Sequence, residues 1–319
     1  MYSIQQLKDT FEFLKNSSIE NIKGCYCIDS KIEGSCVGIA AVTHGDEPSG
    51  LAAFKYFIDN NIYPETGKII FVANNIKAAE NFFKATTDDE KKECRFVDIN
   101  FNRLPENCLE INTTDYEIGR IKEIYPIYQN FDFGLDIHST LTDQKPFIIN
   151  ISDDLNHGLF ADFPDEMEDI VANMVNVQRG IPAVSLFGGE DRNIPILGIE
   201  TGIHVAGKSF EIAIKCALEF CRNCGLLPKS PGKTNIKKYK VYKVVRSVFY
   251  PDTSFATARD FAPFEQLTTK TILAENDKNE KIFSPVNGLT LFGNKQGHIP
   301  KTANDEEFFI TEEPYIIEI

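Results

Sequence analysis

Two histidines and a glutamate are spaced as ligands of a divalent metal would be. His44 and Glu47 stand in VGIAAVTHGDEPSGLAAF, where a predicted strand ends and a predicted helix begins. Sites in open α/β sheets form at such edges. His138 follows the apolar run LDI in a second predicted strand, which would end at the same edge. A catalytic zinc keeps three nitrogen or oxygen ligands from the protein and one open position. These three residues therefore predict a zinc site.

Four further polar residues complement a bound metal chemically. Arg95, Asn102 and Arg103 occur in RFVDINFNR, and Glu200 occurs in ILGIETG. A divalent metal lowers the pKa of a bound water to about 7, and a nearby carboxylate can take its proton and deliver it to a departing amine. Arginine stabilises a developing oxyanion, and an Asn-Arg pair binds a carboxylate. The residue types predict metal-assisted hydrolysis, with Glu200 suited to the proton transfer.

The surroundings of the metal candidates allow local interpretations. On a strand, Asp136 and His138 point to the same face, so we hypothesise that Asp136 accepts the free ring N–H of a ligand imidazole. The alternative for the segment HGDE is a polar loop that caps the helix beginning at Ser49. The complementary residues elsewhere in the chain favour the metal site over this alternative.

Composition and charge narrow the classes of partner. The chain has 319 residues, a formal net charge of -14 and 42% hydrophobic residues. This charge leaves no broad basic surface for phosphates, so nucleic acid and anionic membranes are not expected partners. No run approaches the roughly 20 apolar residues that cross a bilayer. The N-terminal segment MYSIQQLKDTFEFLK lacks the basic flank and apolar core of a signal peptide. We expect a cytoplasmic protein and leave a homo-oligomer open.

The eight cysteines are scattered through the chain without the dense framework of small secreted domains. Reduced thiols are therefore expected. Cys221 and Cys224 form a CxxC at the end of a predicted helix, but no second pair completes a zinc tetrahedron there. Packing or helix-end roles are the expectation for this pair.

Apolar runs and helical patterns alternate along the first part of the chain, which predicts strands joined by crossover helices. The predicted strands are 34–43, 68–74, 131–139, 146–152, 182–187 and 196–200, and the predicted helices are the N-terminal segment, 49–60, 76–85, 166–178 and 209–224. Residues 225–235, GLLPKSPGKTN, break the pattern and are the predicted linker. Beyond them, 238–250, 266–275, 280–293 and 306–319 are predicted to form strands. We expect a domain over 1–225 and a smaller β-rich domain over 226–319.

The motifs HGDEPSG, RFVDINFNR, DIHST and GIETG, in this order, resemble the succinylglutamate desuccinylase and aspartoacylase family, a branch of the zinc carboxypeptidase fold. The resemblance covers most of the first 225 residues and extends less specifically into a β-rich C-terminal domain. It implies an α/β fold with a mixed central sheet flanked by helices. It also implies one Zn²⁺ per chain. By matching position, the implied roles are zinc ligation by His44, Glu47 and His138, carbonyl polarisation by Arg95, carboxylate binding by Asn102 and Arg103, and general base and acid catalysis by Glu200.

Two features of the family match this sequence less directly. Aspartoacylases use a second substrate-binding arginine shortly before the catalytic glutamate, and Arg192 is the candidate for it here. They also use a tyrosine from the C-terminal domain, for which Tyr315, Tyr250 and no equivalent all remain open. Among the other histidines, His157 and His298 are expected to be solvated or hydrogen-bonded, and His204 is a candidate for the pocket wall.

The expected function is that of a zinc-dependent amidohydrolase that removes the acyl group from an N-acyl amino acid, a small acidic substrate. One alternative is a zinc carboxypeptidase or peptide amidase on the same fold, because the same clamp would bind the carboxylate of a peptide. Another is a catalytically silent protein that binds a metabolite. Cysteine-nucleophile catalysis is not expected, because no cysteine has an activating context.

Overall fold

The computed structural model describes residues 2–141, 144–151, 154–189, 192–229, 236–293, 296 and 306–319. Its α-helices are α1 (Ile4–Asn16), α2 (Ser49–Asp59), α3 (Ile76–Lys84), α4 (Asp88–Lys92), α5 (Tyr116–Tyr128) and α6 (Gly207–Asn223), with 3-10 turns η1 (His157–Leu159) and η2 (Ala183–Leu186). The strands of the first part are β1 (Ser18–Ile19), β2 (Ile22–Lys23), β3 (Cys25–Asp29), β4 (Cys36–Ala41), β5 (Lys68–Ala73), β6 (Phe133–Thr140), β7 (Phe147–Asn150), β8 (Asp169–Ala172) and β9 (Ile196–Ile203). The later strands are β10 (Lys238–Phe249), β11 (Ala256–Thr257), β12 (Gln266–Leu267), β13 (Ile272–Glu275), β14 (Lys281–Phe283), β15 (Gly288–Thr290), β16 (Glu306–Thr311) and β17 (Tyr315–Glu318).

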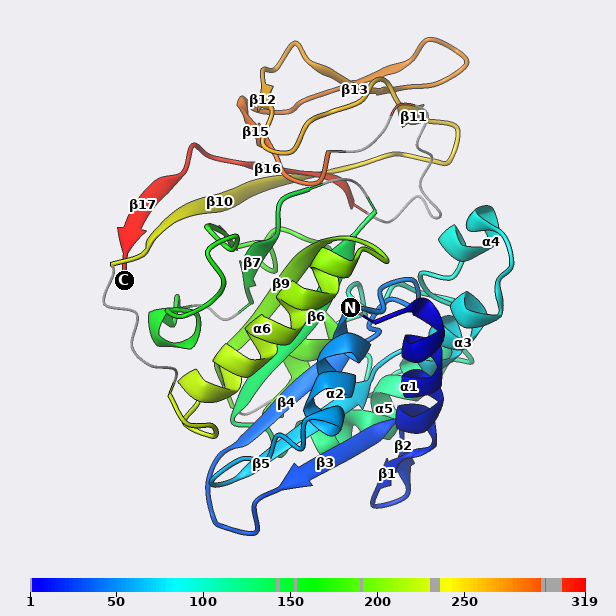
Figure 1. Ribbon diagram of the computed structural model, residues 1–319. Coiled ribbons are helices and arrows are strands. Elements are labelled where there is room, and N and C mark those ends of the chain that lie inside the picture. The colour runs from blue at the N-terminus through cyan, green and yellow to red at the C-terminus, as the bar shows by residue number, and fades with distance from the viewer. Residues whose placement is uncertain are drawn as a thin grey trace.

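A mixed sheet is the centre of the molecule (Figure 1). Its main part has the order β10-β8-β7-β9-β6-β4-β5-β3. Strands β5, β4, β6 and β9 run parallel to their neighbours within that group, whereas β3 and β7 are antiparallel to β5 and β9. The parallel strands are buried on both faces, because helices cover them. The predicted α/β class with a mixed central sheet is confirmed.

Helices cover the two faces of this sheet and enclose separate apolar clusters. Helices α1, α2 and α6 lie on one face, where Phe11, Phe54 and Phe220 are fully buried. Helix α5 lies on the other face, where its Ile121 and Ile124 pack with η2. The apolar residues of each helix recur at the spacing that forms one buried stripe, which explains why these segments are helical.

The C-terminal strands extend the same sheet and also form a small sheet of their own. The first half of β10 pairs in parallel with β8, and its second half pairs with β16, which continues to β15 and β12. Strands β11, β13 and β14 form a separate sheet over an apolar cluster that includes Tyr250 and Phe308. β10 therefore contributes to both parts of the chain, and the predicted domain division at residue 225 stays a prediction. Residues 230–235 of the predicted linker lie outside the described residues.

Two predicted elements are wrong, and α5 was not predicted. Residues 166–178 contain strand β8 and turns instead of a helix. Met167, Ile170 and Met174 have helical spacing, but β7 and β10 pair with both edges of the segment DIVA, so sheet pairing decides its conformation. The predicted strand at 182–187 is the 3-10 turn η2, since a short apolar run after Pro182 does not specify its own conformation.

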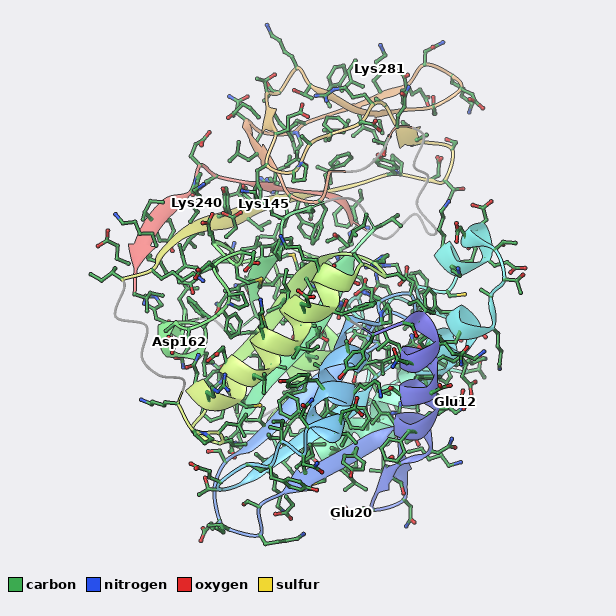
Figure 2. All side chains as sticks on the ribbon, viewed as in Figure 1. Glu12, Glu20, Lys145, Asp162, Lys240 and Lys281 are labelled. Atoms are coloured by element: carbon green, nitrogen blue, oxygen red, sulfur yellow. The ribbon has the colours of Figure 1, made fainter. Side chains whose placement is uncertain are left out.

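Charged side chains are distributed over the outside of the molecule, as the labelled Glu12, Glu20 and Lys281 illustrate in Figure 2. All eight cysteines are free, as expected. No helix among the described residues combines the length and apolarity that a bilayer span requires.

Candidate metal centre

Three adjacent parallel strands bring the predicted site residues to one edge of the sheet. His138 near the end of β6 is the register partner of Glu200 on β9. Strand β4, on the other side of β6, ends shortly before His44 and Glu47. The sheet thus brings together four residues from three segments that lie far apart in the sequence, as the motifs predict.

The turn after β4 has an unusual backbone that aims its side chains. Val42 has a φ of +49°, which costs a β-branched residue on the order of 1–3 kcal/mol. The backbone N–H of Asn75 donates to Val42 O at 3.0 Å, which helps to hold this conformation. At Gly45, a Cβ would lie 2.3 Å from backbone atoms of Ala78 and Cys94, so only glycine allows this close approach. The same contact places the segment that carries Arg95 beside Glu47.

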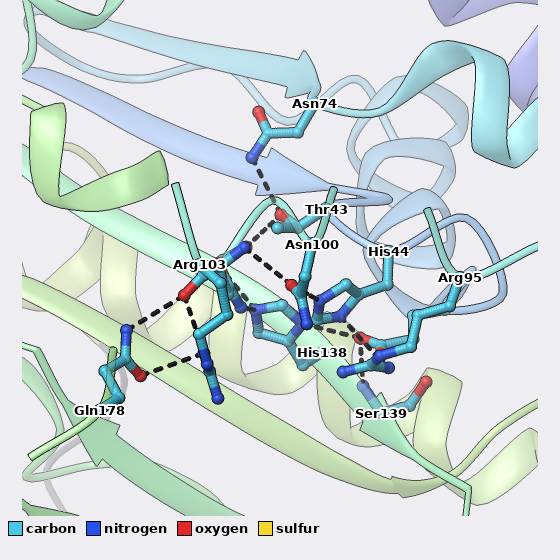
Figure 3. Close-up of polar contacts among 12 residues, drawn as sticks. Thr43, His44, Asn74, Arg95, Asn100, Arg103, His138, Ser139 and Gln178 are labelled. Atoms are coloured by element: carbon cyan, nitrogen blue, oxygen red, sulfur yellow. Dashed lines mark hydrogen bonds and ion pairs between the residues drawn. The ribbon is translucent and has the colours of Figure 1, made fainter. Parts of the chain in front are cut away.

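The ring nitrogens of both histidines converge on one carboxylate (Figure 3). His44 Nδ1 lies 2.9 Å from Glu47 Oε1, and His138 Nδ1 lies 2.7 Å from Glu47 Oε2. All three side chains are buried, and their ligand atoms lie within 4.8 Å of one another. This is the arrangement that the sequence predicts for a metal centre.

The other ring nitrogens determine the tautomers. Asn100 Oδ1 accepts the backbone N–H of Asn102 at 2.9 Å, which identifies it as an acceptor, and His44 Nε2 donates to the same oxygen at 3.0 Å. His138 Nε2 donates to Asp136 Oδ2 at 2.7 Å, which confirms the hypothesis for Asp136. A neutral imidazole has one donor and one acceptor nitrogen, so each Nδ1 carries a lone pair.

Two lone pairs therefore face a carboxylate, which only accepts hydrogen bonds. Such contacts are repulsive unless a proton or a metal ion lies between the atoms. The pKa shifts of the two rings differ: burial, and then the charge of Arg95, lower the pKa of His44. Burial opposes ionisation, yet Asp136 and Glu47 raise the pKa of His138 well above its usual value, and both histidines lower that of Glu47. Two imidazoles and a carboxylate with fixed tautomers fit Zn²⁺ as the cation.

Glu200 lies next to this centre without joining the ligand cluster. The residue is 8% exposed, and its Oε2 is buried with no hydrogen-bond partner among the described residues. Burial, and then the charge of Glu47, raise the pKa of the Glu200 carboxyl well above its usual value. A carboxyl group that lies beside the ligand cluster without joining it can accept a proton and release it again.

The segment after α4 supplies the polar wall of the pocket. Arg95 donates to Glu47 Oε1 at 2.6 Å, and Asn102 and Arg103 also line the cavity beside His44 and Glu200. Arg103 Nη1 donates to the backbone oxygen of Asn102 at 2.7 Å and to Gln178 Oε1 at 3.1 Å. Gln178 also donates to the oxygen of Asn102, so it fixes the orientation of this arginine.

The sequence matches no family model and no curated protein. Solved structures, however, resemble the whole chain. A succinylglutamate desuccinylase from Vibrio cholerae gives a TM-score of 0.64 at 12% identity, covering 98% of this chain and 98% of that chain. A succinylglutamate desuccinylase/aspartoacylase from Rhodobacter sphaeroides gives 0.58 at 17% identity, covering 88% and 87%. Murine aminoacylase 3 gives 0.59 at 18% identity, covering 91% and 98%.

This protein has the succinylglutamate desuccinylase and aspartoacylase fold. Identities of this size establish a shared fold and leave the activity to the chemistry of the site. The agreement extends to the C-terminal strands, because the Vibrio cholerae structure is covered almost from end to end.

Within this desuccinylase fold, Arg192 lies away from the pocket. Its Nη2 donates to Asp132 Oδ1 at 2.5 Å, and Asp132 directly precedes β6. Six residues of extended chain, or about 20 Å, separate Asp132 from His138. The prediction that Arg192 binds substrate is therefore not supported, because the arginine precedes β9 and lies at the opposite end of the strands. Of the candidate tyrosines, Tyr250 donates to or accepts from Thr257 in the C-terminal cluster and Tyr315 is half exposed on β17, and neither lines the pocket.

His204 lies beside the metal centre but is not among the residues that line the pocket. Its Nδ1 is 2.8 Å from Ser139 Oγ, and its Nε2 is 3.8 Å from Asp46 Oδ2. The backbone N–H of Ser139 donates to Glu47 Oε2 at 3.3 Å, so His204 supports a residue that orients Glu47. His157 is exposed in η1, and His298 lies outside the described residues.

A buried hydrogen-bond chain that the sequence did not reveal ends on His138. Tyr128 donates to Asn74 at 2.6 Å, Asn74 donates to Thr43 at 2.9 Å, and Thr43 donates to Asp136 at 2.7 Å. Every hydroxyl and amide in this chain has a fixed direction, and the last acceptor is the carboxylate that holds the His138 ring. No motif marks Asn74 or Tyr128, since their role depends on strands β4 and β5 and helix α5 packing together.

Replacing Thr43 with valine is expected to weaken metal binding by about 10- to 100-fold, because it removes a hydrogen bond that orients Asp136. The isosteric change also leaves Asn74 without its acceptor, which lowers the free energy of unfolding by about 1–3 kcal/mol. Competition with a metal chelator measures the affinity. Thr257→Val is the matched control, because it removes a buried hydroxyl bonded to Tyr250 and should lower stability alone. Equal metal affinity in the two variants would contradict the role of Thr43.

Glu117 on α5 organises the segment that carries Arg95 and Asn102, and the sequence did not predict it. This carboxylate is fully buried. It accepts the backbone N–H groups of Val97 at 2.7 Å, Asp98 at 3.0 Å and Ile99 at 3.2 Å. It also accepts the side-chain amide of Asn75 at 2.9 Å. The carboxylate of Glu117 on α5 thus holds the irregular backbone at residues 97–99 in place.

Replacing Glu117 with glutamine should lower both stability and turnover. The new amide faces backbone N–H groups with a donor, and each orphaned buried donor costs about 1–3 kcal/mol. Displacement of Arg95 by about 1 Å is expected to reduce kcat by up to about 100-fold. Thermal unfolding and steady-state kinetics measure the two effects. Glu123→Gln on the same helix removes the charge of a half-exposed partner of the buried Arg120, which keeps its hydrogen bonds to backbone oxygens, and should change the free energy of unfolding by less than about 1 kcal/mol.

Proposed function

We propose that this protein is a zinc-dependent hydrolase that removes the acyl group from an N-acyl amino acid, and that it belongs to the succinylglutamate desuccinylase and aspartoacylase family. The observation that carries the proposal is the convergence of His44, Glu47 and His138 beside the unligated, buried carboxyl of Glu200. This combination supplies three ligands and a separate proton carrier, which hydrolysis of an amide requires.

His44 Nδ1, His138 Nδ1 and Glu47 would hold one Zn²⁺, which when bound acts as a Lewis acid on the amide carbonyl and activates the attacking water. Glu200 accepts a proton from that water while the water oxygen bonds to the carbonyl carbon. Glu200 then donates the proton to the amine nitrogen as the carbon–nitrogen bond breaks. The products are a carboxylic acid and an amine.

The remaining pocket residues have distinct tasks in this proposal. Arg95 stabilises the negative charge that develops on the carbonyl oxygen. Asn102 and Arg103 bind the substrate carboxylate, and Gln178 keeps the Arg103 guanidinium in place for it. Arg95 donates to Glu47 Oε1 at 2.6 Å, so its guanidinium lies close enough to the metal centre to face a carbonyl bound beside it.

The names of similar structures support an amide substrate of this kind. They include succinylglutamate desuccinylases, murine aminoacylase 3 and the product-bound ectoine utilization protein EutE (DoeB) from Ruegeria pomeroyi. The last gives a TM-score of 0.60 at 16% identity, covering 90% of this chain and 88% of that chain.

Metal analysis followed by a substrate screen tests the proposal. We expect the purified protein to contain one zinc ion per chain and to release amine from N-acetyl or N-succinyl amino acids. Short peptides with a free C-terminus form the comparison set, and faster cleavage of these would identify a carboxypeptidase instead. A zinc-loaded protein that hydrolyses neither set would indicate a binding protein and would refute the proposed reaction.

A further inference from the structure

The pocket beside the metal centre has one polar wall and one apolar wall. Its space amounts to about 580 Å³, open solvent at the mouth included. We call six apolar residues of its lining the apolar wall: Ile149, Ile151, Met174, Val175, Phe292 and Phe309. Ile149 and Phe309 are only 4% and 3% exposed and belong to the cluster that joins the main sheet to the C-terminal strands. Ile149 and Phe309 of the apolar wall therefore belong to a packed core.

Positive charge is scarce in this pocket. The described residues that line it include two arginines, Arg95 and Arg103, and no lysine. Arg95 lies on the metal side, paired with Glu47. The Arg103 guanidinium lies 5.7 Å from the centroid of the Phe309 ring, so the carboxylate-binding residue borders the apolar wall directly. A substrate carboxylate held by Arg103 would thus leave its neighbouring substituent against apolar side chains.

One residue of the pocket lining, Gly198, has no side chain. Gly198 on β9 faces the same side of the sheet as Glu200 and is paired with Ile149 on β7. A Cβ at this position would lie 3.3 Å from Ile149 Cβ and 3.4 Å from Ile151 Cδ1. Even a methyl group at this position would therefore crowd the apolar wall beside Glu200.

We infer that the substrate is an N-acyl derivative of an apolar amino acid of the size of leucine, methionine or phenylalanine, and not of aspartate or glutamate; this rests on the proposed function. The single carboxylate binds Arg103, and the amino-acid side chain packs on the apolar wall. A second carboxylate would lose its hydration against Met174 and Phe309, and no described residue of the lining other than Arg95 and Arg103 supplies a cation to replace it. Selectivity follows from this difference in desolvation.

A matched pair of substrates tests the inference with the zinc-loaded protein. N-acetyl-L-leucine and N-acetyl-L-aspartate have side chains of similar length that differ in charge. We expect kcat/KM for the leucine compound to exceed that for the aspartate compound by about 100-fold or more, in the range that hydrophobic pockets and unpaired charges produce. Equal values, or faster hydrolysis of N-acetyl-L-aspartate, would overturn the inference while leaving the proposed function intact. Hydrolysis of neither compound, nor of any other N-acyl amino acid, would refute the proposed function itself.

A second arm identifies which part of the substrate meets the apolar wall. For N-acylglycines, lengthening the acyl chain should change kcat/KM less than adding the leucine side chain to N-acetylglycine does. A preference that follows acyl length instead would overturn the placement of the amino-acid side chain.

Two variants test the apolar wall directly. Met174→Lys adds a cation to it and should lower the leucine-to-aspartate ratio of kcat/KM by at least about tenfold. Ile316→Lys adds the same charge at a half-exposed position on β17 and should leave the ratio unchanged. Gly198→Ala should reduce kcat/KM for N-acetyl-L-phenylalanine about tenfold more than for N-acetyl-L-alanine. An unchanged ratio in a folded Met174→Lys protein, or equal losses in Gly198→Ala, would contradict the assignment.

Discussion

Replacing Glu200 with glutamine is expected to lower kcat by about 10²- to 10⁴-fold while the metal content stays at the level of the unmodified protein. Glutamine has nearly the same shape but cannot accept the proton of the attacking water. Because Glu200 lies outside the cluster of His44, Glu47 and His138, its loss leaves all three ligands in place. Steady-state kinetics with the best N-acyl amino acid and elemental analysis of the same sample measure the two quantities.

The control for this change is Glu211→Gln on helix α6, which replaces an exposed glutamate and should leave kcat unchanged. Full activity in Glu200→Gln would refute its role as the proton carrier. Loss of metal together with activity would show that Glu200 is a ligand, and the proposed separation of roles would then be wrong.

Replacing His138 with alanine should remove both the metal and the activity. The change deletes one of the three proposed ligands and leaves the buried Asp136 facing an empty volume instead of a ring N–H. Binding should become substoichiometric after dialysis. The activity should fall by at least on the order of 10³-fold, because a catalytic metal supplies several kcal/mol and each 1.4 kcal/mol is tenfold in rate.

Elemental analysis and kinetics check this second result, and the chelator-treated unmodified protein provides a reference that should regain activity when zinc is added. His157→Ala is the matched histidine control, since His157 is exposed in η1 and should affect neither quantity. Full metal content in a folded His138→Ala protein would contradict the assigned ligand set.

The different outcomes expected for Glu200 and His138 follow from their positions on two neighbouring strands. Strand β6 carries His138 with its supporting Asp136, and the neighbouring β9 carries Glu200 together with Gly198. Parallel pairing fixes the separation of these residues, so a ligand and a proton carrier remain close without exchanging roles.

Much of the fold was predictable because local pattern and burial agree. Helix α2 and strands β4 and β5 have the periodicities that their final environments require, and each was predicted close to its observed bounds. Strand β8 shows the limit of this reasoning. The apolar residues Met167, Ile170 and Met174 in and around it have helical spacing, yet pairing with β7 and β10 satisfies the backbone of β8 on both edges.

The residues of the site likewise include some that the sequence identifies and some that it does not. His44, Glu47, His138 and Glu200 were identifiable because ligands and proton carriers must be particular residue types at strand ends. Arg192 shows that proximity in sequence to Glu200 does not mean proximity in space, because the strand leads away from the arginine toward the opposite edge of the sheet.

The sequence by itself determined the chemistry: which side chains can bind a metal, move a proton and pair with a carboxylate. Only the tertiary structure decided how these groups are supported and what surrounds them. Asn100 fixes the His44 tautomer, Glu117 holds the Arg95 segment, and Phe309 borders Arg103 from the C-terminal strands. The physical reason is that tautomers, desolvation and pocket shape depend on contacts between residues distant in sequence, whereas the capacity to ligate or ionise belongs to the residue itself.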